Sequence, residues 1–154
     1  MTPRRLRVQF FNPPAFPPGE PERRYRLNPP LAPAILAAVF ARAGHRASAA
    51  DLEALGVSPA FLAATFDAQR DRWPDAVGFT VCTFSAHGAK ACVQALRAVG
   101  YDGYIALGGP HITLAGRGSV DDLESWGADA WVVGECEGNV VEVFEERRQG
   151  LIEG

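Results

Sequence analysis

Two adjacent glycines follow an apolar run and are the residues best placed to hold a ligand against the backbone. The run Tyr104–Leu107 has strand character and ends at Gly108-Gly109, which Pro110 and His111 follow. Paired glycines after a buried strand indicate either a tight turn or close approach of another molecule to the main chain. If the strand belongs to a parallel sheet, this corner lies at the carboxyl edge, where open α/β folds bind ligands.

Two hydroxyl side chains follow the preceding apolar run, residues 76–81, and are expected to face the glycines. They are Thr83 and Ser85, separated by Phe84. Ser85 is a good N-cap for the next helix, and its hydroxyl could also contact a ligand. We therefore expect a narrow channel with hydroxyls at one wall and bare glycine backbone at the other. Such a channel suits a flat or elongated ligand inserted edge-on.

Metal and nucleophile chemistry are not indicated. The three cysteines, Cys82, Cys92 and Cys136, are widely spaced, and neither CxxC nor CxxxCxxC occurs. A zinc site or a cysteine-ligated iron–sulfur cluster is therefore not predicted. We expect the side chain of His111 to hydrogen-bond loop backbone rather than to bind a metal. A hydrolase is unsupported because there is no nucleophile elbow.

Composition and charge indicate a single soluble domain of 154 residues with a net charge of −3. This charge gives no reason to expect nucleic acid. Nothing in the sequence resembles a signal peptide, and the longest apolar run, 31–41, is too short to span a bilayer, so a reduced, cytoplasmic protein is expected. The charge is uneven, with arginines in the first 26 residues and acids from Asp121 onward. This bias reflects either solvated faces or an interface with a partner domain.

Strand and helix patterns alternate five times, which is typical of a doubly wound α/β fold with a parallel sheet. A flavodoxin-like strand order, 2-1-3-4-5, is the natural solution, and it brings together the loops after the first, third and fourth strands. The first of these loops, residues 12–30, is long and rich in proline. The expected strands are residues 6–11, 47–50, 76–81, 104–107 and 130–133, and the expected helices are residues 33–43, 59–69, 86–99, 119–125 and 139–149.

The loops exclude several common ligands of this fold. GxGxxG does not follow the first strand and GxxxxGK[ST] is absent, so neither a dinucleotide site nor a P-loop is predicted. A phosphorelay receiver needs acidic residues after the first strand, where this chain has Asn12-Pro13. The same segment has too few donors for the phosphate loop of a flavodoxin.

Several ordered pieces, which together cover nearly the whole chain, carry a resemblance to a known family. They are Asn12-Pro13-Pro14, Pro29-Pro30-Leu31, Ala43-Gly44-His45, Val77-Gly78-Phe79-Thr80, Ser85-Ala86-His87, Leu107-Gly108-Gly109-Pro110-His111 and Val133-Gly134-Glu135-Cys136-Glu137. In these pieces the sequence resembles the cobalamin-binding domain found at the N-terminus of many radical SAM enzymes. The fold implied is the one already predicted, with cobalamin across the carboxyl edge and its nucleotide tail between the third and fourth strands.

The resemblance implies a set of cofactor-binding residues. Thr83 and Ser85 would hydrogen-bond the tail, Gly108-Gly109 would let it lie against the backbone, and Phe84 would sit near the lower face of the corrin. The full expected set is Asn12, Pro13, Thr83, Phe84, Ser85, Gly108, Gly109, Pro110, His111, Gly134 and Glu135, where the last two close the far rim.

Two departures limit what the resemblance implies. Cobalamin-dependent mutases and methionine synthase carry DxHxxG after the first strand, and this chain has no histidine there. We therefore expect base-off cobalamin without a histidine ligand. Radical SAM chemistry needs CxxxCxxC, which is absent, so the chain is expected to be a truncated domain or a stand-alone carrier with no methyltransferase activity of its own. The alternative is a small-molecule-binding or interaction module on the same fold that has lost cobalamin.

Overall fold

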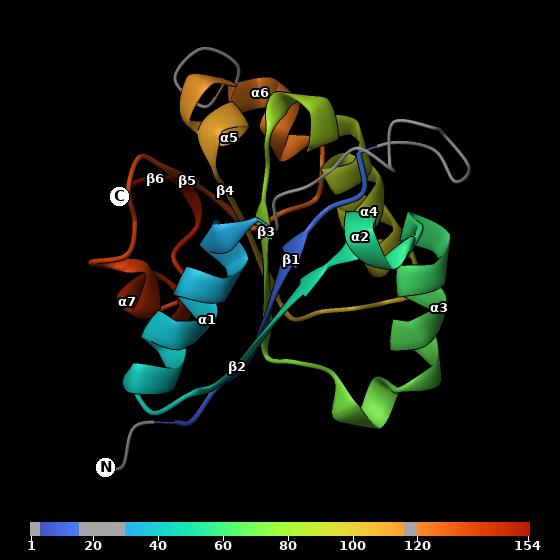
Figure 1. Ribbon diagram of the computed structural model, residues 1–154, viewed down its shortest axis with the longest axis horizontal. Helices are drawn as coiled ribbons and strands as arrows, with labels where there is room; N and C mark the ends of the chain where they lie inside the picture. The colour runs from blue at the N-terminus through green and yellow to red at the C-terminus, as the bar shows by residue number, and fades with distance from the viewer. Residues whose placement is uncertain (1–3, 16–29, 116–119) are drawn as a thin grey trace.

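The protein is one parallel α/β sheet with helices on both faces (Figure 1). The computed structural model describes residues 4–15, 30–115 and 120–154. The strands are β1 (Arg7–Asn12), β2 (Arg46–Asp51), β3 (Ala76–Thr80), β4 (Tyr104–Gly108), β5 (Ala130–Val133) and β6 (Gly150–Glu153). The helices are α1 (Leu31–Arg42), α2 (Leu52–Leu55), α3 (Pro59–Ala68), α4 (Ala86–Ala98), α5 (Pro110–Ala115), α6 (Val120–Glu124) and α7 (Val140–Glu145), with 3₁₀ turns at Arg70–Arg72 and Thr83–Ser85.

The sheet has six strands in the order β2-β1-β3-β4-β5-β6, and all pairs are parallel. The predicted doubly wound, flavodoxin-like class and the order of the first five strands are confirmed. The sixth strand was missed. The last helix was predicted to reach residue 149, but it ends at Glu145, and Arg147 takes a left-handed φ of 50°. This turn frees β6 to pair with β5.

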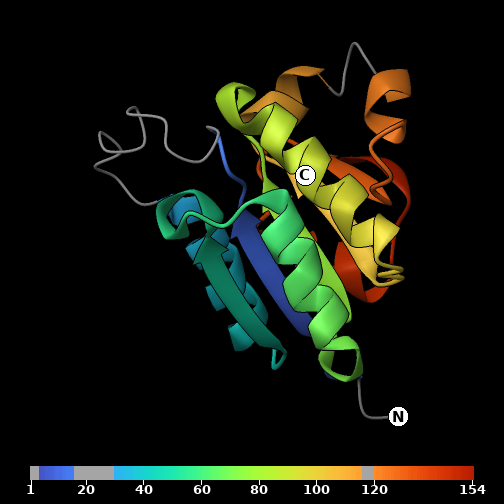
Figure 2. The same ribbon diagram turned by 90° about the vertical axis from the view of Figure 1, so that its right-hand side faces the viewer.

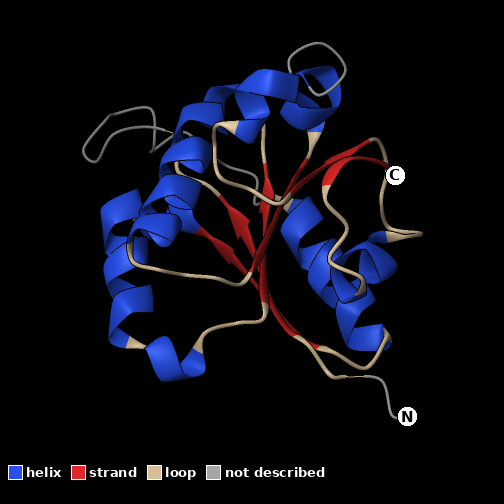
Figure 3. Ribbon diagram, turned by 180° about the vertical axis from the view of Figure 1, so that it is seen from behind, coloured by secondary structure: helices blue, strands red, loops and turns tan. Residues whose placement is uncertain are grey.

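Two apolar clusters occupy the two faces of the sheet. On one face, α3 and α4 lie side by side over the sheet (Figure 2) and enclose Val77, Phe79, Ile105 and Leu107. On the other face, α1 and α7 cover a cluster centred on Phe40. Seen from behind, the strands form the middle layer between these two groups of helices (Figure 3).

The helices otherwise lie close to their predicted positions, with two short additions. Neither α2 nor α5 was predicted, and α5 begins at Pro110, where the fixed φ of proline suits the first helical turn. None of the helices in the described ranges is long and apolar enough to cross a bilayer. Most of the proline-rich loop predicted over residues 12–30, and the arginines at positions 23, 24 and 26, lie outside the described residues.

Candidate functional site

A cavity of about 570 Å³ lies at the carboxyl edge of the sheet on the face covered by α1 and α7. Its walls come from the ends of β3, β4 and β5, from the start of α1, from α5 and α7, and from the loop after β5. The volume falls within the range of about 300–1,000 Å³ typical of small-molecule and cofactor sites. The residues that line it are Phe10, Ala32, Leu36, Gly78, Phe79, Thr80, Ala106, Leu107, Gly108, Gly109, Pro110, Thr113, Leu114, Val132, Gly134, Glu135, Cys136, Glu137, Val140 and Phe144.

The floor of the cavity exists because small residues alternate along the two central strands. Side chains of successive residues point to opposite faces of a sheet. On β3 and β4 the cavity face carries Gly78, Thr80, Ala106 and Gly108, whereas larger residues occupy the opposite face. Because these floor residues have short side chains, the space between the sheet and the helices above it is not filled, and a cavity remains.

The glycine corner forms one side of the cavity mouth. Gly109 has a φ of 101°, and a Cβ there would lie 2.8 Å from both the backbone N and O of Val81. Gly109 therefore has to be glycine for the turn itself. Gly108 differs, because a Cβ there would meet only the carbonyl oxygen of Val132, at 3.8 Å. The absence of a side chain at Gly108 leaves cavity space open rather than relieving a clash.

The loop after β5 forms the other side of the mouth. The backbone N–H of Gly134 donates to the hydroxyl of Thr113 at 3.0 Å, which fixes this loop to α5. Glu135 and Glu137 are exposed, and the Cys136 thiol is partly buried between them. Burial, reinforced by Glu137, raises the pKa of Cys136 to about 11, so the thiol is neutral near pH 7.

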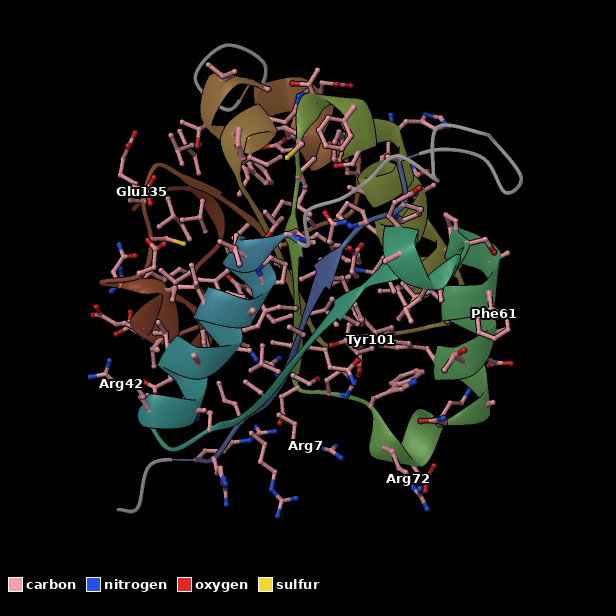
Figure 4. The ribbon with its side chains drawn as sticks, in the orientation of Figure 1. Arg7, Arg42, Phe61, Arg72, Tyr101 and Glu135 are labelled. Atoms are coloured by element: carbon pink, nitrogen blue, oxygen red, sulfur yellow. The ribbon has the colours of Figure 1, made fainter. Side chains whose placement is uncertain are left out.

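Exposed carboxylates lie at the rim of the cavity, at the carboxyl edge of the sheet. Glu135 lies at the upper left in Figure 4, beside the cavity, while Arg7, Arg42 and Arg72 lie at the lower end. Arg4 is paired with Asp75 at 2.6 Å. The arginines near the amino ends of the strands are thus accompanied by acidic partners, whereas Glu135 and Glu137 make the cavity rim acidic.

Aromatic rings close the inner end of the cavity. Phe10 and Phe144 both line it, with ring centroids 5.7 Å apart. Phe40 packs edge-on against both, at 5.2 Å from Phe10 and 5.1 Å from Phe144. Gly78 lies beneath Phe10, where a Cβ would come within 2.6 Å of the Phe10 ring.

The structure does not place the predicted hydroxyls at a wall of this cavity. Ser85 is fully buried, and its Oγ accepts from the Cys82 N–H at 3.1 Å and donates to the Cys82 carbonyl at 3.2 Å. Ser85 is the N-cap residue of α4, as predicted, but its side chain makes no capping bond to that helix. Thr83 and Phe84 are exposed on the turn after β3. The wall opposite Gly108 and Gly109 is the loop after β5.

Asn12, the last residue of β1, and Pro13 are buried and do not line the cavity. Asn12 is buried and donates from Nδ2 to Asp51 at 2.7 Å. Three residues later, the N–H of Ala15 donates to the carboxylate of Glu53 at 2.6 Å. These contacts fix where the chain leaves β1.

None of the three histidines lines the cavity. The backbone N–H of His111 donates to the Val81 carbonyl at 3.0 Å, and its ring stacks on Trp126. The expected bond from the His111 side chain to loop backbone stays a prediction. His87 is exposed on α4, and His45 is buried and accepts from the Leu6 N–H at 3.2 Å. Within the described ranges, no group of three or more His, Cys, Asp and Glu side chains could hold a metal ion.

Sequence reasoning missed several residues that line the cavity, chiefly Gly78, Thr80 and Thr113. A signal was present for the first two. Every second residue of β3 is small, so the alternation predicts one face of the strand with small side chains and one with large side chains. The hydrogen bond between Thr113 and Gly134 joins residues that are 21 positions apart, so no local sequence pattern predicts it.

Comparison with known protein families decides which fold family this site belongs to. The model of the B12 binding domain matches residues 24–144, which is most of the chain. The chain belongs to the B12-binding domain family. Its cofactor is accordingly cobalamin, as the resemblance implied. No curated protein matches the chain.

Two solved structures share the fold of this B12-binding domain. Both are of TsrM, a radical S-adenosylmethionine methyltransferase from Kitasatospora setae, one with tryptophan substrate and a SAM analogue bound and one with cobalamin and a [4Fe-4S] cluster bound. Each has a TM-score of 0.70, with 19% and 18% identity over 94% and 95% of this chain. The chain spans only 26% of the length of either TsrM structure.

Proposed function

We propose that this domain holds base-off cobalamin, with no histidine on cobalt, for a radical SAM methyltransferase-type catalytic domain or partner. The observation that carries the proposal is the cavity at the carboxyl edge, with glycines at its mouth and small residues on its floor. When bound, the cobalt of the corrin would supply methyl-transfer chemistry. The reaction would need groups beyond this chain, which has no CxxxCxxC motif.

The cavity residues fit the nucleotide tail of cobalamin. The tail would lie against Gly108 and Gly109, where nothing projects from the backbone. Thr80 and Thr113 offer hydroxyls near the mouth, and Gly134 with Glu135 would border the far rim. Phe84, which is 54% exposed on the turn after β3, is proposed to lie near the lower face of the corrin.

The proposed absence of a histidine ligand rests on two observations. Asn12 occupies the end of β1, where a lower ligand would be carried by the DxHxxG motif, and it is bonded to Asp51. The cavity has no histidine among its lining residues. We further propose a reducing, cytoplasmic setting, in keeping with three free cysteines.

Titration of the purified chain with hydroxocobalamin tests the proposal. We expect the visible spectrum to move toward that of base-off cobalamin, with one equivalent retained after desalting. A double variant, His87→Ala with His111→Ala, should leave that spectrum unchanged. A base-on or histidine-ligated spectrum would contradict the ligation state, and a folded protein that retains no corrinoid would favour the rival module that has lost cobalamin.

A further inference from the structure

We infer that the closed end of the cavity selects among corrinoids by the lower base of the nucleotide tail, admitting an apolar benzimidazole and disfavouring a purine. This inference rests on the proposed function, since it assumes that the tail enters this cavity. It concerns a different property, namely which corrinoid is preferred, and so can fail independently.

The cavity changes from polar to apolar along its depth. Its mouth carries the side chains of Thr80, Thr113, Glu135 and Glu137, which are partly or fully exposed. The closed end is formed by buried side chains without a polar atom. These are Phe10, Ala106, Val132, Val140 and Phe144.

The backbone at the closed end is also engaged. Gly78 pairs with Ala106 in the ladder between β3 and β4, and Ala106 pairs with Ala130 in the ladder between β4 and β5. Main-chain donors and acceptors in a sheet interior are consumed by such ladders. Neither the apolar side chains of the closed end nor the paired backbone of Gly78 and Ala106 therefore offers a polar base a hydrogen-bonding partner.

The aromatic pair at the closed end suits a flat apolar ring. Phe10 and Phe144 are held by Phe40 in edge-to-face contacts, so their positions are fixed before a ligand arrives. Aromatic rings pack favourably edge-to-face or offset against another ring. A methyl-bearing benzimidazole would place carbon against these side chains.

A purine base has a similar shape to benzimidazole but carries more polar groups, which the closed end does not match. Adenine carries an exocyclic amine and additional ring nitrogens, all of which are hydrogen-bonded in water. Burying such groups without partners is costly, whereas removing methyl groups from water is favourable. The two bases should therefore be discriminated by the walls of the cavity rather than by any hydrogen bond.

Equilibrium dialysis of the full chain against three corrinoids tests this. The probes are cyanocobalamin, the cyanocobamide with adenine as lower base, and cobinamide, which has no nucleotide. We expect cyanocobalamin to bind about tenfold or more tightly than the adenine form. Equal affinity for the two, with both tighter than cobinamide, would overturn the inference and leave the proposed function standing. A folded chain that binds none of the three overturns both.

A matched pair of variants separates the closed end from general effects on the fold. Val132→Thr places a hydroxyl at the closed end with little change in shape, and should reduce the preference for benzimidazole over adenine by about threefold or more. Val77→Thr makes the same change on the other face of the sheet, where Val77 is equally buried but does not line the cavity. Its preference should match that of the original chain. An unchanged preference in folded Val132→Thr would contradict the inference.

Discussion

The hydroxyl of Thr113 accepts a hydrogen bond of 3.0 Å from the backbone N–H of Gly134, and this contact joins the two sides of the cavity mouth. Thr113 lies on α5, which starts directly after the glycine corner. Gly134 ends β5 with a φ of 88° and opens the loop that forms the far rim. The width of the mouth therefore depends on a bond between elements that are not sheet neighbours.

Replacing Thr113 by valine should loosen the far rim. The change removes the acceptor for the Gly134 N–H while keeping the branched shape of the side chain. We expect corrinoid affinity to fall about fivefold, equivalent to about 1 kcal/mol, as measured by equilibrium dialysis. Thr65→Val is the control, since Thr65 makes one comparable bond, to Phe61 on α3, and does not line the cavity. Equal losses in the two variants would argue against a role for the rim.

Alanine at position 108 should affect binding and not folding. A Cβ there has room in the protein, and alanine is better than glycine in a strand interior. The added methyl group would project into the cavity, so we expect stability to be unchanged or slightly higher and corrinoid affinity to fall about tenfold. Gly138→Ala is the control, because Gly138 has open space around it and does not line the cavity. Undiminished affinity in Gly108→Ala would place the tail elsewhere.

Alanine at position 109 should destabilise the fold itself. The residue has a left-handed φ of 101°, and its Cβ would come within 2.8 Å of the Val81 backbone. Strain of this kind costs on the order of 1–3 kcal/mol. Urea denaturation should show this loss of stability in the absence of any corrinoid, in contrast to Gly108→Ala. A stability equal to that of the original chain would mean that the corner can relax.

The thiol of Cys136 should report on both pH and ligand. Its raised pKa of about 11 means that the thiolate fraction grows about tenfold per pH unit between pH 7 and pH 10. Alkylation by iodoacetamide should rise in parallel, followed in a variant that keeps only this cysteine. Methylcobalamin should slow the reaction, because Cys136 lines the cavity. An alkylation rate that levels off near pH 9, the ordinary pKa of a thiol, would show that burial does not raise the pKa of Cys136.

Alkaline pH should unfold the protein partly through Cys92. Burial raises the pKa of this thiol from 9.0 to about 12 in the folded state. A raised folded-state pKa contributes stability that is complete below pH 9 and is lost as pH rises toward 12, by up to about 1.4 kcal/mol per pH unit. In urea titrations at several pH values, the stability advantage of the original chain over Cys92→Ala should shrink above pH 9. A constant advantage would contradict this linkage.

The sequence was sufficient for the class of fold. Strand and helix character follow from local periodicity and from breakers such as Gly44 and Gly100, so five strands and their order could be predicted. The sixth strand could not, because the four residues Gly150–Glu153 carry little pattern and depend on β5 for their pairing. The helix before it ends at Glu145, and Arg147 then takes a left-handed backbone conformation. Arginine type alone does not predict this conformation.

The candidate site also has one part that the sequence could predict and one part that it could not. The sequence by itself determined that Gly108 and Gly109 end a buried strand at the carboxyl edge, since glycine type and strand position are local properties. Only the tertiary structure decided what faces them. The hydroxyl of Ser85 is hydrogen-bonded to the backbone of Cys82. The loop from Gly134 to Glu137 is instead bonded to α5 through Thr113. Which distant side chains meet across a cavity depends on how helices pack on the sheet, and that packing is a property of the whole chain.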